Sequence, residues 1–173
     1  MKYENVTMKG DENEFRFSLT KEGNKKLVVF GVNPSTANEQ TADLTITKVM
    51  GFADRNGFDG FIMLNLYPQR CTNPADLDKE IDEELHRQNL EEIRLSVYNI
   101  ERPVILLGFG DTIHLRPYLK RCLKEIVNIL ATYNPQWKNV GTLTKNGNPR
   151  HLSRVSYDKL SNFDVQEYIS THL

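Results

Sequence analysis

L-V-V-F-G-V-N-P-S-T-A, at residues 27–37, is the stretch that decides the fold. Its apolar run ends at Gly31, a pattern typical of a buried parallel strand. Pro34 disfavours a helical conformation at Asn33. Asn33 is therefore expected beyond the carboxyl end of the strand, where open α/β sheets bind their ligands. Two interpretations of Asn33 stay open: its amide faces a ligand, or it braces the turn.

Composition and charge limit the class of protein. The chain has 173 residues, enough for one well-buried domain, which we predict at 14–173 after a loosely ordered segment at 1–13. The formal net charge of −1 argues against a surface that holds duplex DNA by bulk electrostatics. No apolar stretch reaches the roughly 20 residues that span a bilayer, and the amino terminus has no signal-peptide core. We expect a cytoplasmic protein that does not associate with membranes.

The segments around residues 27–37 predict a βαβ unit. Asp43 is a plausible N-cap for a helix whose apolar residues recur at helical spacing up to Ala53. A second buried strand follows at 58–66 and contains Asn65. Parallel strands end at one edge of a sheet, so Asn33 and Asn65 should face one crevice. Before this unit, F-R-F-S-L-T at 15–20 alternates like an edge strand, which we expect to form a hairpin with the strand at residue 27.

The rest of the chain continues the alternation of strands and helices. We expect helices at 79–99, 115–130 and 163–173, and strands at 103–107 and 140–143. Together these elements predict a three-layer α/β/α sandwich with a mostly parallel sheet of four or five strands. Gly108, which ends the third core strand, admits the close approach of a ligand or of another backbone.

Several polar side chains are candidates for the crevice. The amides of Asn33 and Asn65 suit reading the edge of a nucleobase or holding a water molecule. Asp43 either caps its helix or faces the ligand. Tyr67 either stacks on a planar ligand or belongs to the core, and Arg70 either clamps a phosphate or is solvated.

His151 is the histidine most suited to a functional role. It lies in a turn-rich segment between Arg150 and Arg154, and these cations should lower its pKa and favour the neutral imidazole. A neutral imidazole can donate a hydrogen bond to a developing oxyanion or to a phosphate. The two cysteines, Cys71 and Cys122, match no metal or redox spacing and are expected to be free thiols.

Four motifs resemble the domain of unknown function 1643 family over nearly the whole chain. They are N-P-S-T-A at 33–37, D-x-T at 43–45, N-L-Y-x-x-R at 65–70 and G-x-P-R-H at 147–151. V-V-F-G-V-N-P-S also resembles the first motif of the uracil-DNA glycosylase-like superfamily. That second resemblance implies the fold of that superfamily, with Asn33 positioning the attacking water, Asn65 reading the base and His151 stabilising charge on the departing base. Leu152 stands where that superfamily has a proline.

These observations predict a crevice for a nucleobase, a nucleotide or a single-stranded nucleic acid, with no cofactor and no metal. The protein is either a hydrolase of N-glycosidic bonds, with Asn33 or Asp43 holding the water, or a non-catalytic module that binds a nucleotide or a protein. The candidate catalytic residues are Asn33, Asp43 and His151, and the candidate binding residues are Gly31, Pro34, Ser35, Asn65, Tyr67, Arg70, Gly108 and Arg150.

Overall fold

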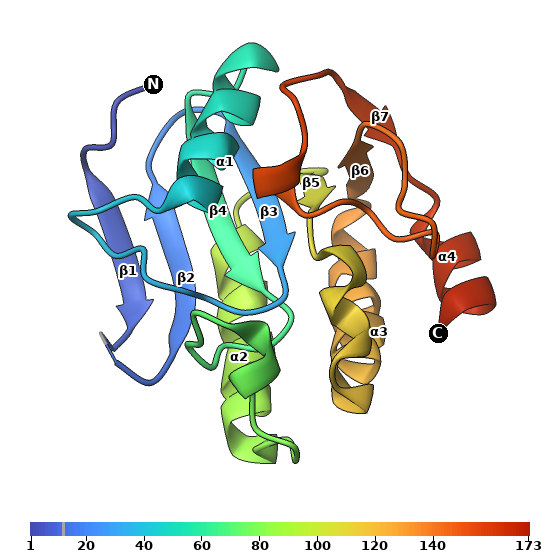
Figure 1. Cartoon of the computed structure of the whole chain (residues 1–173). Helices are drawn as coiled ribbons and strands as arrows, with labels where there is room; N and C mark the ends of the chain where they lie inside the picture. Colours follow the sequence, from blue (N-terminus) through green and yellow to red (C-terminus); the bar gives the residue numbers. More distant parts are fainter. Residues whose placement is uncertain (12) are drawn as a thin grey trace.

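A seven-stranded mixed sheet forms the centre of the computed structural model, which describes residues 1–11 and 13–173. The strand order is β1-β2-β4-β3-β5-β6-β7 (Figure 1). The neighbours β4, β3, β5 and β6 run parallel, whereas β1, β2 and β7 are antiparallel additions at the two sides. The strands are β1 (Val6–Gly10), β2 (Arg16–Lys21), β3 (Lys26–Gly31), β4 (Gly60–Asn65), β5 (Val104–Leu107), β6 (Gln136–Val140) and β7 (Leu160–Asn162).

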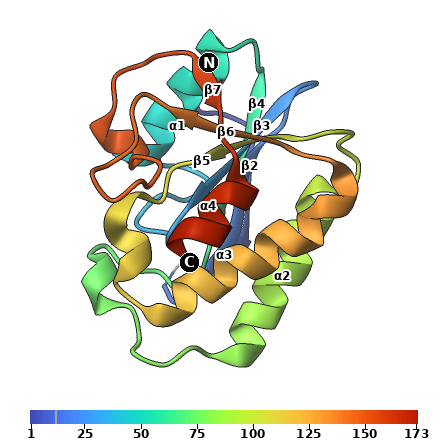
Figure 2. The same cartoon turned by 90° about the vertical axis from the view of Figure 1, so that its right-hand side faces the viewer.

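Helices cover both faces of the sheet (Figure 2), which confirms the α/β class. Helix α1 (Leu44–Arg55) packs on one face, where it meets the alternate β3 residues Leu27 and Val29. The other face, with Val28 and Phe30, packs against α2 (Glu83–Val97), α3 (Pro117–Leu130) and α4 (Val165–His172). Within the described residues, none of the helices has both the length and the apolar character needed to cross a membrane.

The βαβ unit β3-α1-β4 forms as the sequence predicts. The Oδ1 atom of Asp43 accepts a hydrogen bond from the backbone N–H of Ile46 at 2.9 Å and so caps α1. Strands β3 and β4 pair in parallel with Gly31 opposite Asn65. The last residues of the two strands are therefore direct neighbours, and the chain beyond them lies at one edge of the sheet.

The sheet differs from the prediction in size and at its edges. The prediction of four or five strands is wrong because antiparallel strands extend the parallel centre on both sides. One of them, β1, lies within the segment 1–13, of which residue 12 is outside the described residues. The predicted hairpin between β2 and β3 is also wrong. Strand β2 pairs with β4, with Leu19 opposite Met63, and β1 is the edge strand.

An irregular register between β1 and β2 shapes the site. Lys9 pairs with Ser18, but the next residue of β1, Gly10, pairs with Arg16, so Phe17 has no partner. An extra residue of this kind turns the following side chains to the opposite face of the sheet. Accordingly, Ser18 contacts Glu92 of α2, whereas Arg16 lies on the α1 face.

Candidate functional site

A cavity of about 780 Å³ opens at the carboxyl ends of β3 and β4, on the α1 face of the sheet. Its walls come from the loop after β3, the first turn of α1 and the segment 144–154. This volume suits a ligand of the size of a mononucleotide. Predicted site residues that line it are Gly31, Asn33, Ser35, Asp43, Arg150 and His151.

Asn33 braces its loop and also lines the cavity. Its Nδ2 atom donates to the carbonyl oxygens of Pro34 and Cys71, each at 2.9 Å, and so braces the loop. Among the described residues its Oδ1 atom has no partner, and the residue lines the cavity. The brace thus fixes the side chain while it leaves the amide oxygen as an acceptor for a ligand or a water.

Asp43 also divides its side chain between structure and cavity. One carboxylate oxygen caps α1, while in the described part of the chain the other has no hydrogen bond or ion pair. The first-turn residues Leu44 and Thr45 line the cavity beside it. Their N–H groups have no partner within the described residues, as is usual for the first turn of a helix. The positive end of the α1 dipole therefore faces the cavity.

His151 presents a hydrogen-bond donor in its neutral form. Its Nδ1 atom lies 2.8 Å from the Oγ atom of Ser153 and accepts from the Ser153 backbone N–H at 3.4 Å, which places the ring proton on Nε2. Burial lowers the pKa of His151, Arg154 lowers it further, and Asp43 acts in the opposite direction. The direction is the one that the sequence predicts, but burial is a larger cause than the neighbouring cation.

The segment that carries His151 is held in place from two sides. Asp111 accepts hydrogen bonds from the Thr144 hydroxyl and the Asn148 amide, both at 2.6 Å, and these bonds lower its pKa. The Oδ1 atom of Asn148 accepts a bond from the hydroxyl of Tyr168 in α4 at 2.6 Å. This network anchors the segment to both the end of β5 and the last helix.

Asn65 lies fully buried beneath the cavity. Neither its Oδ1 nor its Nδ2 atom has a hydrogen-bond partner among the described residues. Gly31 stands directly opposite, and a Cβ atom built on it would lie 3.1 Å from that Oδ1 and 2.9 Å from the Met63 methyl carbon. Gly31 and Met63 both line the cavity. The Asn65 amide therefore lies beneath two residues of the lining, one of which, Met63, ends in a flexible side chain.

The remaining predicted residues support the site without lining the cavity. Tyr67 is a core residue, whose hydroxyl accepts from the Asp82 backbone N–H and whose ring packs against Tyr118. Gly108 makes room for Leu152, since a Cβ there would lie 2.5 Å from the Leu152 Cγ atom.

Arg70 and Pro34 also lie outside the cavity lining, and both brace the loop after β3. Arg70 donates to the backbone oxygens of Asp11 at 3.0 Å and Ser35 at 2.6 Å. The Pro34 carbonyl accepts from the backbone N–H of Cys71 at 3.0 Å.

The sequence analysis missed Arg16, which lines the cavity although only 2% of it is exposed. One guanidinium nitrogen donates to the carbonyl of Ala37 at 3.0 Å, and in the described part of the chain the Nε atom has no partner. Burial and the charge of Arg70 lower the pKa of Arg16 to about 10. The alternating pattern placed Arg16 on the exposed face. The register shift between β1 and β2 moves its side chain to the α1 face, and Gly10 at this shift has a positive φ of +132°.

The cavity carries more positive than negative charge. Arg16, Lys145, Arg150 and Arg154 line it, against the carboxylates of Asp43 and Asp111. The whole chain has a formal charge of −1, so this excess is local to the cavity. Such a local excess favours an anionic ligand. In the part of the chain that the structure describes, no three His, Cys, Asp or Glu side chains form a group that could hold a metal ion.

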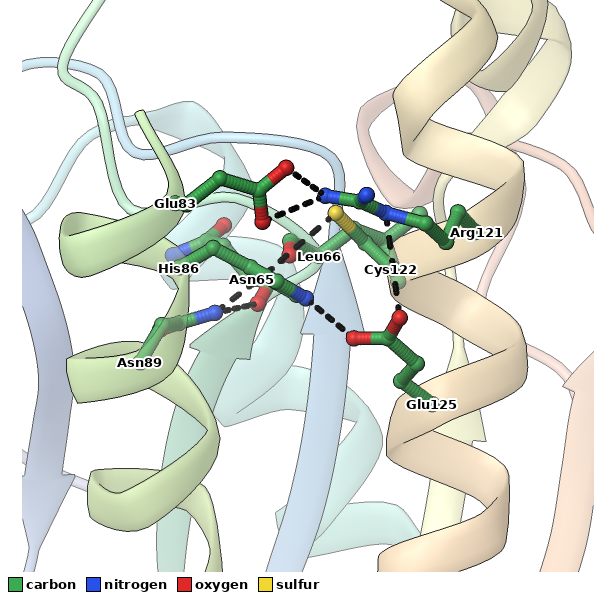
Figure 3. Close-up of polar contacts among 8 residues, drawn as sticks. All are labelled: Asn65, Leu66, Glu83, His86, Asn89, Arg121, Cys122 and Glu125. Atoms are coloured by element: carbon green, nitrogen blue, oxygen red, sulfur yellow. Dashed lines mark hydrogen bonds and ion pairs between the residues drawn. The ribbon is translucent and has the colours of Figure 1, made fainter. Parts of the chain in front are cut away.

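A second polar cluster lies on the opposite face, between α2 and α3 (Figure 3). There Asn89 donates to the backbone oxygens of Asn65 at 3.1 Å and of Leu66 at 3.3 Å, and so holds the end of β4 from behind. His86 lies between Glu125, at 2.6 Å, and the sulfur of Cys122, at 3.5 Å.

Burial disfavours the nucleophilic thiolate in this Cys-His-Glu arrangement. Burial raises the pKa of Cys122 to about 12, so its thiol stays protonated at neutral pH. Both cysteines of the chain are free.

Residues 16–151 match the family model described as a protein of unknown function (DUF1643), and the chain belongs to that family. The matched segment includes both Arg16 and His151, and it contains every residue of the cavity lining except Ser153 and Arg154. No curated protein and no solved structure matches the chain. The resemblance to the DUF1643 family is therefore confirmed, whereas the likeness to uracil-DNA glycosylases stays a prediction.

Proposed function

We propose that this DUF1643 protein binds the base of a nucleotide or of a nucleic acid in the cavity and hydrolyses the N-glycosidic bond between that base and its sugar. The observation that carries the proposal is the carboxamide of Asn65, which is fully buried and has no partner among the described residues. An unpaired buried amide costs about 1–3 kcal/mol, and a ligand that offers a donor and an acceptor would remove this cost. The edge of a nucleobase has that pattern.

The chemistry follows from the groups around Gly31. Asp43, which lines the cavity together with Asn33, holds a water whose oxygen attacks the anomeric carbon of the sugar. The bond from that carbon to the base nitrogen breaks, and its electron pair leaves with the base. The proton of the water passes to the free oxygen of Asp43, and the Nε2–H group of His151 donates a hydrogen bond to the charge on the departing base.

A covalent route is less favourable than direct attack by water. Cys71 also lines the cavity, but burial raises the pKa of its thiol and so disfavours the nucleophilic thiolate. Positioning of the water and stabilisation of the leaving base would supply most of the rate.

A second candidate is a binding module without catalysis. The observation in its favour is that both water-holding candidates have structural roles, since Asn33 braces its loop and Asp43 caps α1. Under this alternative the cavity binds the same ligands but releases no base.

The Asp43→Asn variant separates the two candidates. Asparagine caps a helix about as well as aspartate, so α1 should stay intact while the carboxylate is lost. The matched control is Asp82→Asn at the N-cap of α2, where the side chain accepts from the Leu85 backbone N–H at 3.0 Å. Thermal shift with nucleosides, nucleotides and short single strands measures binding, and chromatography of the released base measures hydrolysis.

We expect the wild type and Asp82→Asn to bind the same nucleotide ligands with equal affinity. The two proteins should also release base at equal rates. Asp43→Asn should bind with similar affinity and release base about 10²–10⁴ times more slowly, the usual contribution of a general base. Binding without release by the wild type would leave the binding module as the function. No thermal shift with any of these compounds would refute both candidates.

A further inference from the structure

Arg16 is a buried cation whose surroundings lack a paired anion. Among the described residues it forms no ion pair, and the one hydrogen-bond partner of its guanidinium is the neutral carbonyl of Ala37. Asp43 favours the charged form of Arg16 but forms no ion pair with it. A guanidinium that is 2% exposed and not neutralised is costly, because burial removes its hydration.

Two further features accompany Arg16 at the cavity, of which one lines it and the other lies beneath it. The first turn of α1 directs the N–H groups of Leu44 and Thr45 and the positive end of the helix dipole toward it. The unpaired amide of Asn65 lies on β4, the strand next to the β2 strand of Arg16. A helix amino terminus and a buried, unneutralised guanidinium together form a site for an anion.

The order of the strands sets the order of these groups across the sheet and so indicates the direction in which a ligand would extend. Across the floor, Arg16 on β2 comes first, then Met63 and Asn65 on β4, then Gly31 on β3. His151 is at the far side, where its backbone approaches Gly110 after β5. A base above Gly31 and Asn65 thus has His151 on one side, and the anionic part of the ligand extends to Arg16 on the other.

We infer that the ligand carries a terminal phosphate and that Arg16, with the first turn of α1, binds this phosphate. This inference rests on the proposed function and names its substrate class: a nucleoside monophosphate. A terminal phosphate monoester fits better than the phosphodiester of a strand. Arg16 is nearly closed to solvent, and a continuing chain would have to pass through that closed end.

The exposed cations of the cavity have a different role. Lys145 and Arg154 are exposed, so salt screens their attraction for an anion over about 8 Å at physiological ionic strength. The charge of Arg16 is shielded from solvent and should be far less sensitive to salt. The contribution of Arg16 to phosphate binding can therefore be separated experimentally from that of the surface charges.

The test compares a nucleoside, its 5′-monophosphate, the matching dinucleoside monophosphate and inorganic phosphate by calorimetry, at 0.05 and 0.5 M salt. For the wild type we expect the monophosphate to bind at least about tenfold more tightly than the nucleoside, as a charge-assisted hydrogen bond provides. The dinucleoside monophosphate should bind no better than the nucleoside. Arg16→Met should lose most of the preference for the monophosphate at 0.5 M salt, where the exposed cations are screened.

Arg154→Met is the matched control, because it removes an exposed cation from the same cavity. It should weaken monophosphate binding at 0.05 M salt and have no effect at 0.5 M, whereas the effect of Arg16→Met should persist at both. Arg16→Gln, checked by its melting transition, replaces Arg16→Met if the latter does not fold. A 5′-phosphorylated strand that binds as tightly as the monophosphate would show a strand end as the ligand and overturn the choice of a free mononucleotide.

The outcomes separate this inference from the proposed function. Equal affinity of the wild type for nucleoside and monophosphate would overturn the inference and leave the nucleobase site standing. Binding of inorganic phosphate that depends on Arg16, with no binding of any nucleoside and no release of base, would keep the phosphate site and refute the proposed function. Retention of the full preference for the monophosphate in Arg16→Met at 0.5 M salt would refute the role of Arg16.

Discussion

Asn65→Leu should make the protein more stable, which is the reverse of what most substitutions in a core do. Asn65 is fully buried at the end of β4, and both polar atoms of its side chain lack partners among the described residues. A polar group of this kind costs about 1–3 kcal/mol. Leucine has a similar shape and no polar atoms, so it removes the cost and keeps the packing.

The expected gain is about 2 kcal/mol in the free energy of unfolding, because two unpaired atoms are removed and the branched leucine packs imperfectly. In a chain of 173 residues, such a gain raises the melting temperature by about 4–8 °C. With a slope of about 2 kcal/mol per molar urea, the midpoint of urea unfolding should rise by about 1 M at unchanged slope. The same variant should lose binding of nucleobases.

Asn89→Leu provides the matched control. Asn89 is also fully buried, but its Nδ2 atom donates to the backbone oxygens of Asn65 and Leu66. Leucine at this position removes both bonds and should lower the free energy of unfolding by about 1 kcal/mol, since each bond is worth about 0.5–1.5 kcal/mol and the unpaired Oδ1 atom offsets part of the loss. A loss of stability in Asn65→Leu as large as that in Asn89→Leu would refute the reasoning.

Two further predictions concern the position and charge of His151. Arg154→Gln should raise the pKa of His151, followed by NMR titration of the imidazole, but leave it below 6.5 because burial is the larger cause of the shift; a value at or above 6.5 would contradict this order of causes. Gly108→Ala should abolish ligand binding in calorimetry and cost about 1–3 kcal/mol in urea unfolding, because the new methyl would overlap Leu152 at 2.5 Å and displace the neighbouring His151. Unchanged ligand affinity in Gly108→Ala would contradict the displacement.

The parts of the fold that depend on local signals could be predicted from the sequence. Helix α1 begins after Asp43 because its cap and its apolar period of 3.6 residues lie within a few residues of each other. Strands β3 and β4 are buried on both faces, so they appear as continuous apolar runs. The position of Asn33 and Asn65 at one edge of the sheet follows from the parallel pairing of these strands.

The edges of the sheet depend on pairings that no local pattern contains. Strand β7 has only three residues, and β2 pairs with a strand more than 40 positions later in the chain, with Leu19 opposite Met63. In the turn between β2 and β3, the backbone N–H groups of Asn24 and Lys25 donate to Asp59, which lies next to β4 and fixes the turn there. A tertiary contact thus decides what the turn connects.

Arg16 could not be predicted as a site residue for the same reason, because its position depends on strand pairing. The alternation F-R-F-S-L-T assigns Arg16 to the face of Ser18, and one unpaired residue in the register, Phe17, reverses that assignment. Arg70 was a candidate from the sequence, and it lies in the loop after β4. In the structure it braces the backbone around Ser35, while the buried Arg16 lines the cavity.

The unpaired polar atoms themselves argue for a ligand. Among the described residues, the buried side-chain atoms without partners belong to Arg16, Asn65 and Asn89. Proteins contain few such atoms, and each needs a physical reason. For Asn89, the two hydrogen bonds that its Nδ2 atom donates to the end of β4 compensate for its one unpaired oxygen. Asn65 has no compensating bond within the described chain, and Arg16 has one, so the floor of the cavity is destabilising in the free protein. A ligand with a base and a phosphate would supply partners for both side chains at once, which is why a mononucleotide accounts for the two together.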